Sequence, residues 1–224
     1  MEIRPQQSQR KKNRKTMKIE VPTSWEAISL KKYQAINALF KESKSKGESL
    51  KDKAKELHDY NTECALISLL TDTDMDEILS LNRSAHNAIM NNLTFLQQPI
   101  IGKVKTRTRA NGKRYYFEKN ARKITGGQWI SLMHFLEDEN KLDENLHNLL
   151  ACFAYRVKWL MPKYDGKIHE DVARDMQELP ITFVKPLTDF FLQSYLKYAM
   201  RTLRFSEIAL RAIQRKAVRM SQHS

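Results

Sequence analysis

Histidines, cysteines and clustered carboxylates are the residues of this sequence that could do chemistry, but their spacing does not group them into a known site. The sequence contains no HxxxH or CxxC motif. Its six histidines are too far apart to form one: His58, His86, His134, His147, His169 and His223. Zinc sites usually draw ligands from such short spacings, so the sequence predicts no metal site. It also lacks GxxxxGKS/T, GxGxxG and GxSxG, the patterns that bind phosphate or dinucleotide or present a nucleophilic serine. We therefore expect no cofactor.

The cysteines and the acidic clusters have simpler explanations than catalysis. Cys64 and Cys152 are far apart and lie in apolar stretches, so they are predicted to be buried free thiols in a reducing compartment. The acidic clusters 137–139 and 143–144 flank a predicted loop between helices. Carboxylates at the start of a helix stabilise it through the helix dipole, and we prefer this interpretation to a catalytic acid–base pair.

Gly126-Gly127-Gln128 is the sharpest catalytic candidate, because the same tripeptide lies at the tip of class-I peptide release factors, which hydrolyse peptidyl-tRNA. Here it follows Thr125 and precedes an apolar helical pattern. Thr-x-x-Gln is a capping box, in which the Gln128 side chain bonds back to the backbone of the cap residue. A release loop has to be exposed and mobile. We therefore predict that the tripeptide begins a helix and that the chain is not an enzyme.

Positive charge is segregated along the chain, whose formal net charge is +13. Residues 1–18 contain seven Lys or Arg and one Glu, residues 103–123 contain nine and one, and residues 201–224 contain six and one. The rest of the chain is therefore net acidic. Such segregation indicates that the three basic segments meet a polyanion or an acidic partner surface.

The basic segments supply the candidate binding residues. Clustered Lys and Arg neutralise phosphates and release counterions, and the aromatic run 115–117 places stacking-capable rings beside the central cations. For the central segment, contact with nucleic acid, contact with a partner protein and plain solvation all stay open, whereas an interaction role is preferred for the N-terminal tail. The residues expected to bind nucleic acid or a partner are Arg10, Lys11, Lys12, Arg14, Lys15, Lys105, Arg107, Arg109, Lys113, Arg114, Arg211 and Arg215.

These residues have to be positioned by a mainly α-helical fold. With only six Gly and six Pro in 224 residues, the chain has too few turn residues for an all-β sandwich or barrel. Apolar residues recur at helical spacing on both sides of a central segment. Within that segment, residues 103–118 around Asn111-Gly112 predict a β-hairpin, because Asn-Gly supplies the positive φ angles of a type I′ turn. We expect this basic hairpin to project from a multi-helix body.

The predicted organisation has five parts: a basic N-terminal tail (1–17), a helical half (18–98), the hairpin segment (99–123), a second helical half (124–203) and a basic C-terminal helix (204–224). Residues 42–56 are predicted to be a solvated connector broken at Gly47, and residues 142–158 a helix. Pro186 is placed in the first turn of another helix. No stretch approaches the ~18 apolar residues of a membrane span, and the charged N-terminus lacks the apolar core of a signal peptide.

Several short strings of residues occur in a characteristic order between about residues 22 and 191. They are Val21-Pro-Thr-Ser-Trp-Glu-Ala-Ile-Ser-Leu-Lys-Lys-Tyr33, Arg114-Tyr-Tyr-Phe117, Lys123-Ile-Thr-Gly-Gly-Gln-Trp-Ile-Ser-Leu132, Asn145-Leu-His-Asn-Leu-Leu-Ala-Cys152, Lys163-Tyr-Asp-Gly166, Met176-x-x-Leu-Pro180 and Asp189-Phe-Phe191. This order is similar to that of small proteins encoded in the virion-gene clusters of tailed bacteriophages, often described as tail-assembly chaperone-like. The resemblance implies a non-enzymatic role in building the phage particle, without catalytic or cofactor-binding residues.

Two segments lie outside the resemblance, namely the basic tail 1–17 and the Arg-rich helix 204–220. A pure chaperone has little use for either, so we predict a protein that is assembled in the host cytoplasm and retained in the virion. It would be a ring or adaptor subunit of the head–tail connector, neck or tail region. Such a subunit would form a homo-oligomeric ring, contact the portal and neighbouring ring or tail proteins, and touch packaged DNA. The alternatives are a transient tail-assembly chaperone and a general nucleic-acid-binding protein.

Overall fold

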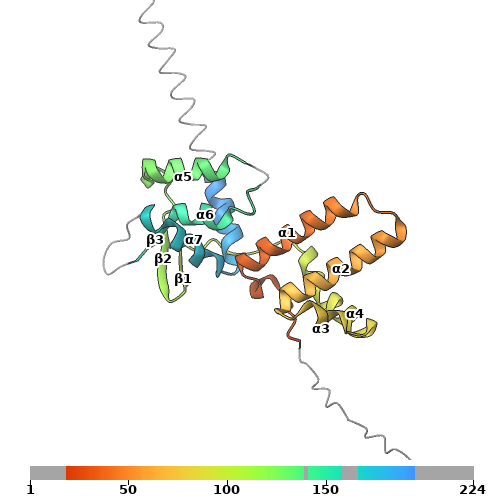
Figure 1. Ribbon diagram of the computed structural model, residues 1–224. Helices are drawn as coiled ribbons and strands as arrows, with labels where there is room; N and C mark the ends of the chain where they lie inside the picture. The colour runs from red at the N-terminus through yellow and green to blue at the C-terminus, as the bar shows by residue number, and fades with distance from the viewer. Residues whose placement is uncertain (1–18, 139–140, 158–165, 195–224) are drawn as a thin grey trace, which may run out of the picture.

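The computed structural model describes residues 19–138, 141–157 and 166–194, which form a mainly helical fold with one small antiparallel sheet (Figure 1). This confirms the predicted fold class. The α-helices are α1 (Leu30–Gly47), α2 (Asp52–Thr71), α3 (Met75–Leu79), α4 (Arg83–Asn92), α5 (Gly126–Leu136), α6 (Leu146–Phe153) and α7 (His169–Gln177). A further helix covers 181–194, and the 3-10 turns are η1 (Trp25–Ala27), η2 (Leu93–Gln97), η3 (Ala121–Lys123) and η5 (Gly166–Ile168). No helix of the described chain is both long and apolar enough to span a bilayer.

The helices α1 and α2 pair at one end of the molecule, and α3 and α4 pack against α2 (Figure 1). Ser29 begins α1, because its hydroxyl accepts a hydrogen bond from the Lys32 N–H at 3.3 Å, the usual N-cap interaction of serine. The predicted connector at 42–56 is wrong at both ends, since α1 continues to Gly47 and α2 already begins at Asp52. The Lys and Glu residues of these helical turns are good helix formers.

The other end of the molecule contains the sheet, α5, α6, α7 and the helix 181–194 (Figure 1). The strands β1 (Arg107–Ala110), β2 (Lys113–Phe117) and β3 (Ala154–Arg156) are antiparallel and lie in the order β1-β2-β3. The helices α6 and α7 pack against each other. Core residues at this end include Leu149, Leu150, Met176 and Phe191.

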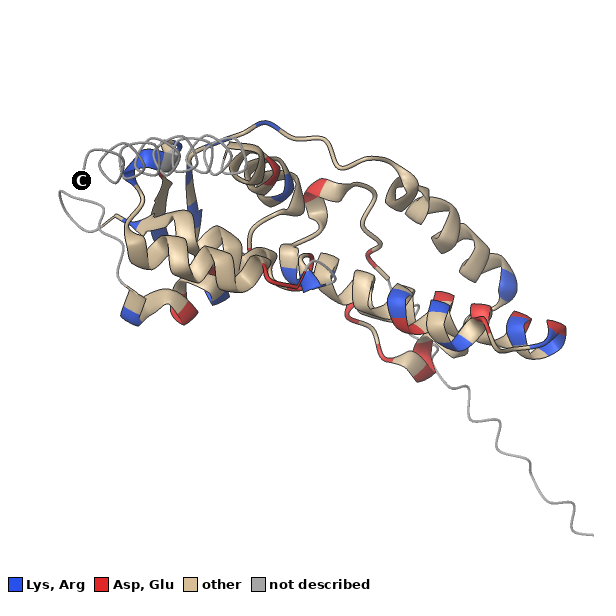
Figure 2. Cartoon of the chain, turned by 90° about the horizontal axis from the view of Figure 1, so that it is seen from above, with Lys and Arg blue, Asp and Glu red and all other residues tan. Residues whose placement is uncertain are grey.

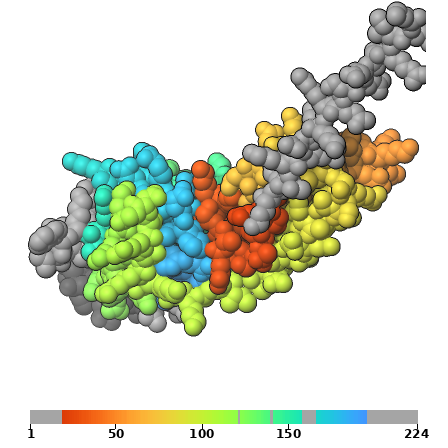
Figure 3. All heavy atoms as spheres, turned by 90° about the horizontal axis from the view of Figure 1, so that it is seen from below, coloured from red at the N-terminus to blue at the C-terminus, as the bar shows by residue number. Residues whose placement is uncertain are grey.

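The β-hairpin is confirmed at its predicted turn, but it does not project from the helical body. Asn111 and Gly112 have φ angles of 47° and 72°, as a type I′ turn requires. The paired strands are shorter than the predicted span 103–118. Because β2 also pairs with β3 and buries Tyr115 and Phe117, the hairpin lies against the helices. Figure 3 shows its light-green surface alongside the blue segment that contains α7.

Strand β3 replaces the end of a predicted helix. The pattern at 142–158 predicted one continuous helix, but α6 ends at Phe153 and the next three residues pair with β2. Tyr155, for example, lies opposite Tyr116. A three-residue strand shows too little alternation to be recognised from sequence, and the pairing with a distant strand decides its conformation.

Pro186 lies inside the helix 181–194 and not in its first turn as predicted. Proline has no N–H to donate to the carbonyl four residues earlier, which here belongs to Thr182. The segment that leads from η2 to β1 passes directly over this carbonyl, because a Cβ on Gly102 would lie 1.9 Å from the Thr182 oxygen. Gly102 is therefore required by the close approach of two backbones, and it fixes the path into the sheet.

Backbone bonds join the start of α1 to the residues that precede the helix 181–194. Ser29 forms an isolated antiparallel bridge with Pro180. Beside it, the Leu30 N–H donates to the Leu179 carbonyl at 2.8 Å. These bonds connect the end of the molecule that contains α1–α4 to the end that contains the sheet.

Candidate anion-binding surface

The alternation of side chains along β1 and β2 divides the cations of the hairpin between two faces of the sheet. Arg107 and Arg109 are exposed, whereas Ala110 is buried. Arg109 lies opposite Arg114, and Arg107 lies opposite Tyr116. Residues opposite each other in an antiparallel pair share a face, so one face carries all three arginines and Tyr116. We call it the outer face.

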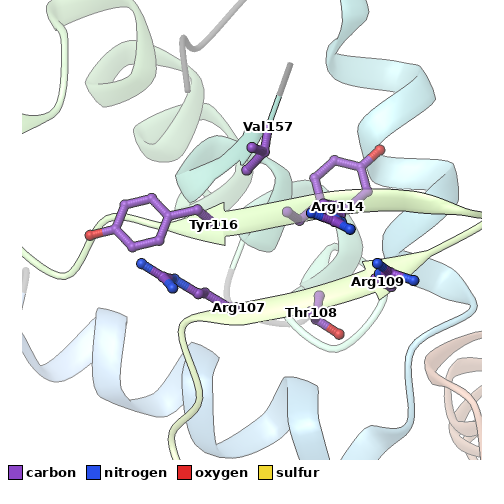
Figure 4. A pocket seen from close by; sticks show the side chains of 7 residues that line it. Arg107, Thr108, Arg109, Arg114, Tyr116 and Val157 are labelled. Carbon is purple, nitrogen blue, oxygen red and sulfur yellow. The ribbon is translucent and has the colours of Figure 1, made fainter. Parts of the chain in front are cut away.

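The outer face is hollowed (Figure 4), with a volume of about 660 Å³. Figure 4 shows the guanidinium of Arg107 reaching toward the ring of Tyr116, while Arg109 and Arg114 lie together farther along the strands. The described residues that line the hollow are Arg107, Thr108, Arg109, Arg114, Tyr115, Tyr116 and Val157. Pockets of this volume are large enough to hold a small ligand or a ligand group.

The three arginines form no ion pair with any carboxylate among the residues that the structure describes. Figure 2 shows the contrast with α1 and α2, where blue and red residues lie close together. Like charges directly opposite each other destabilise a strand pair, and Arg109 and Arg114 are such a pair. The outer face is therefore expected to gain stability when an anion binds.

Lys113 lies on the opposite face and already has an acidic partner. Its Nζ donates to Oδ2 of Asp175 on α7 at 2.7 Å, and Asp175 is only 3% exposed. The side-chain amide of Asn111 donates to the same carboxylate at 2.8 Å, and the Tyr115 hydroxyl donates to it as well. The structure thus separates Lys113 from the three arginines with which the sequence grouped it.

Asp175 is held in its ionised form by these donors. Burial on its own raises the pKa of Asp175, but the hydrogen bonds from Lys113, Tyr115 and Asn111 outweigh burial and hold the pKa below its usual value. Burial, and next the hydrogen bond to Asp175, raise the pKa of Tyr115, so its hydroxyl keeps the proton that it donates. Sequence reasoning missed Asp175. Its one signal was a charged residue three positions after Val172, on the apolar side of α7.

Among the other described candidate residues, Lys105 does not line this hollow. Lys105 is exposed and precedes β1. Val157, which does line the hollow, was missed because the predicted helix 142–158 concealed its position at the end of a strand. Seven candidates lie outside the described residues, namely Arg10, Lys11, Lys12, Arg14, Lys15, Arg211 and Arg215.

The Gly-Gly-Gln tripeptide begins α5, and the predicted capping box is confirmed. The Thr125 hydroxyl accepts from the Gln128 N–H at 3.2 Å, and the Gln128 side-chain oxygen accepts from the Thr125 N–H at 2.8 Å. Gln128 Nε2 also donates to the Cys152 carbonyl at 2.7 Å, and Gln128 is 1% exposed. Gln128 therefore fastens the start of α5 to α6 and is withdrawn from solvent.

The two cysteines are free and buried, as predicted. Burial raises the pKa of the Cys152 thiol to about 12, so the thiol is protonated and unreactive at neutral pH. Burial lowers the pKa of His147, which lies 3.0 Å from Nε2 of Gln34 on α1. Within the described ranges, no three His, Cys, Asp or Glu side chains are grouped so that they could hold a metal ion.

No family model, curated protein or solved structure matches this chain.

Proposed function

We propose that this chain is a non-enzymatic virion protein of a tailed bacteriophage, a ring or adaptor subunit of the head–tail connector, neck or tail region. Its outer face holds an anionic partner, and other surfaces contact the portal and neighbouring subunits. The observation that carries the proposal is the group of three exposed arginines without acidic partners among the described residues. The phage setting rests on the order of short strings that resembles the tail-assembly chaperone-like proteins.

Arginines on a strand pair that have no acidic partner among the described residues favour a binding role. Without a bound partner, the protein would be more stable if Arg109 or Arg114 were replaced by a neutral residue, since like charges opposite each other repel. An anionic partner offsets this repulsion through charge-assisted hydrogen bonds from the guanidinium groups. The arrangement therefore supports a surface that is completed by a partner.

The residues that could have been catalytic have structural roles instead, and this supports a non-enzymatic function. Gln128 caps α5 and bonds to α6. Asp175 fixes the hairpin to α7, and Cys152 lies in the core. Side chains engaged in this way are not available to touch a substrate.

Helix α5 supports contacts with neighbouring subunits. Ile130 and Met133 are 71% and 49% exposed, and their spacing of three residues places them on one side of the helix. Exposed apolar residues that share one side of a helix contribute to protein interfaces. A ring or adaptor subunit needs such contacts in addition to a surface for its anionic partner.

Mass spectrometry of purified particles of the encoding phage tests the proposal. We expect the protein in the particle at a copy number equal to, or a small multiple of, that of the portal protein, because a ring subunit follows the symmetry of its neighbours. Absence from the particle, together with abundant protein in the infected lysate, would overturn the proposal and favour the transient chaperone.

A further inference from the structure

We infer that the anionic partner of the outer face is a single strand of nucleic acid, which places phosphates on the three arginines and a base on Tyr116. The inference rests on the proposed function for one point only, the assignment of the outer face as an anion-binding surface. It adds the chemical class of the partner and a role for an aromatic side chain.

The charge of the outer face determines the kind of partner that it fits. Its three arginines have no carboxylate partner among the residues that the structure describes. Charge complementarity therefore favours a negatively charged partner.

The three arginines have the chemistry and the spacing to bind successive phosphates. A guanidinium presents a planar fork of N–H donors that can engage two oxygens of one phosphate. Arg107 and Arg109 are two residues apart on β1, which places their Cα atoms about 7 Å apart. Arg114 lies directly opposite Arg109. A strand that runs along β1 meets Arg107 and Arg109 in turn, and Arg114 contacts the second phosphate from β2.

Tyr116 distinguishes a nucleic-acid strand from other anions. It is half-buried on the outer face, directly opposite Arg107, and Figure 4 shows the two side chains reaching toward each other. A tyrosine ring is a stacking platform for an unpaired base of any sequence. A peptide of Asp and Glu has no ring to place there, and the bases of a duplex are stacked on one another. A single strand uses both the arginines and Tyr116.

The shape of the outer face fits the same partner. Its hollow of about 660 Å³ lies within the range of pockets that enclose small ligands. It can therefore take a nucleotide-sized group.

Fluorescence anisotropy of the full-length protein with a labelled oligothymidylate tests the phosphate contacts. The variant replaces Arg107, Arg109 and Arg114 together by Ala. We expect the slope of log affinity against log salt to become shallower by about 1.4, because each of the two phosphates neutralised on a single strand contributes about 0.7. The affinity lost should be larger for the oligothymidylate than for a duplex of the same length.

The matched control removes the same charge from the other end of the molecule. It replaces three exposed lysines of α1 and α2 by Ala, namely Lys44, Lys53 and Lys55. The control should keep the wild-type salt slope. An equal change of slope in the control and in the arginine variant would mean that binding is diffuse, and it would overturn the inference.

Replacing Tyr116 tests the stacking contact. Tyr116→Leu should weaken binding of the oligothymidylate by about tenfold, the size expected for one stacked base, and leave duplex binding unchanged. Tyr116→Phe keeps the ring and should bind like the wild type. Circular dichroism shows whether each variant is folded, and the arginine variant supplies the test if Tyr116→Leu does not fold.

Two outcomes would overturn the single-strand inference without touching the proposed function. One is an equal loss of oligothymidylate and duplex affinity in the arginine variant. The other is tight binding of an oligoglutamate that the arginine variant abolishes, which would assign the outer face to an acidic protein partner. Conversely, absence of the protein from phage particles would overturn the proposed function and leave the binding results standing.

Discussion

Asp175 couples the fold to pH, because three side chains of the hairpin donate to this one buried carboxylate. The folded-state pKa of Asp175 is lowered, and the usual value for Asp in an unfolded chain is about 3.9. The ionised carboxylate therefore contributes stability that is present above about pH 4. That contribution is lost as the pH falls through the folded-state pKa.

We expect Asp175→Asn to lower the free energy of unfolding at pH 7 by about 2–3 kcal/mol, because it leaves Lys113 without its buried partner. Urea unfolding followed by circular dichroism would measure the change. The difference from the wild type should begin to shrink below about pH 4 and continue to shrink as the pH falls through the lower folded-state pKa of the wild-type carboxylate.

Asp171→Asn is the control for this experiment, because Asp171 also lies on α7 and its side chain is 59% exposed. It should change the free energy of unfolding by less than about 0.5 kcal/mol. An effect of Asp175→Asn that did not vary with pH would contradict the role given to the charge.

Gln128→Ala is expected to lower the free energy of unfolding by about 2 kcal/mol, since it removes half of the capping box and the bond to the Cys152 carbonyl. Thermal unfolding would measure the loss. Gly127→Ala is the matched variant, because a Cβ there has only the Thr125 hydroxyl nearby, at 3.9 Å. It should be neutral or stabilise α5 by up to about 1 kcal/mol. A hydrolytic tripeptide would instead lose activity on peptidyl-tRNA in both variants.

Residue roles could be predicted from the sequence where the interaction is local. The capping box spans Thr125 to Gln128, and the type I′ turn depends on Asn111 and Gly112. The same turn fixes the hairpin register. The sequence could therefore also have predicted that the three arginines share one face of the hairpin and that Lys113 lies on the other. The role of Asp175 was not, because its partner Tyr115 lies 60 residues earlier in the chain.

At the scale of elements, Gly102 shows how two segments constrain each other. In the helix 181–194, Pro186 has no N–H to donate to the Thr182 carbonyl. The segment that leads to β1 crosses the helix at this carbonyl. The crossing is possible only without a side chain at residue 102. The path from α4 to the sheet and the position of the proline therefore depend on each other.

Gly102→Ala is expected to lower the free energy of unfolding by about 3 kcal/mol, because the added Cβ forces one of two backbones to move. Urea unfolding would measure the loss. The matched variant is Gly126→Ala, where a Cβ would meet nothing within 4 Å and alanine favours the helix. If Gly102→Ala were as stable as Gly126→Ala, the proposed backbone contact would be wrong.

The elements that sequence patterns missed are those decided by tertiary contacts. The strand β3 has only three residues and exists through its pairing with β2, so its residues were predicted to continue α6. Pro186 fits a first helical turn by local preference, but the helix starts earlier, next to the bridge between Ser29 and Pro180. Local propensity is a weak guide where such contacts compete with it.

At the scale of the whole molecule, a ligand of the outer face should stabilise the fold. The outer face exists only when β1 and β2 are in register, so its ligand binds the folded chain and not the unfolded one. At a free ligand concentration of 100 times Kd, such linkage contributes about 2.7 kcal/mol. A ligand that binds the folded and the unfolded chain equally well does not stabilise the fold.

We expect an oligothymidylate at that concentration to raise the Tm of the wild type by about 5–10 °C, given about 2–4 °C per kcal/mol for a chain of this size. Differential scanning fluorimetry would measure the shift. The variant with Ala at Arg107, Arg109 and Arg114 should show little or no shift, whereas the lysine control should shift like the wild type. A shift that survives the arginine replacement would place the stabilising contact elsewhere.

The separation of 60 residues between Tyr115 and Asp175 also has a consequence for synthesis on the ribosome. A hairpin can form in microseconds once it has emerged, but at about 5–20 residues per second the chain needs roughly 3–12 s to deliver α7. During that interval the arginines can already be aligned, while Phe117 on the opposite side has nothing to cover it. The nascent chain thus displays its cationic side before its apolar side is buried, and that apolar side is the part that a ribosome-associated chaperone has to protect.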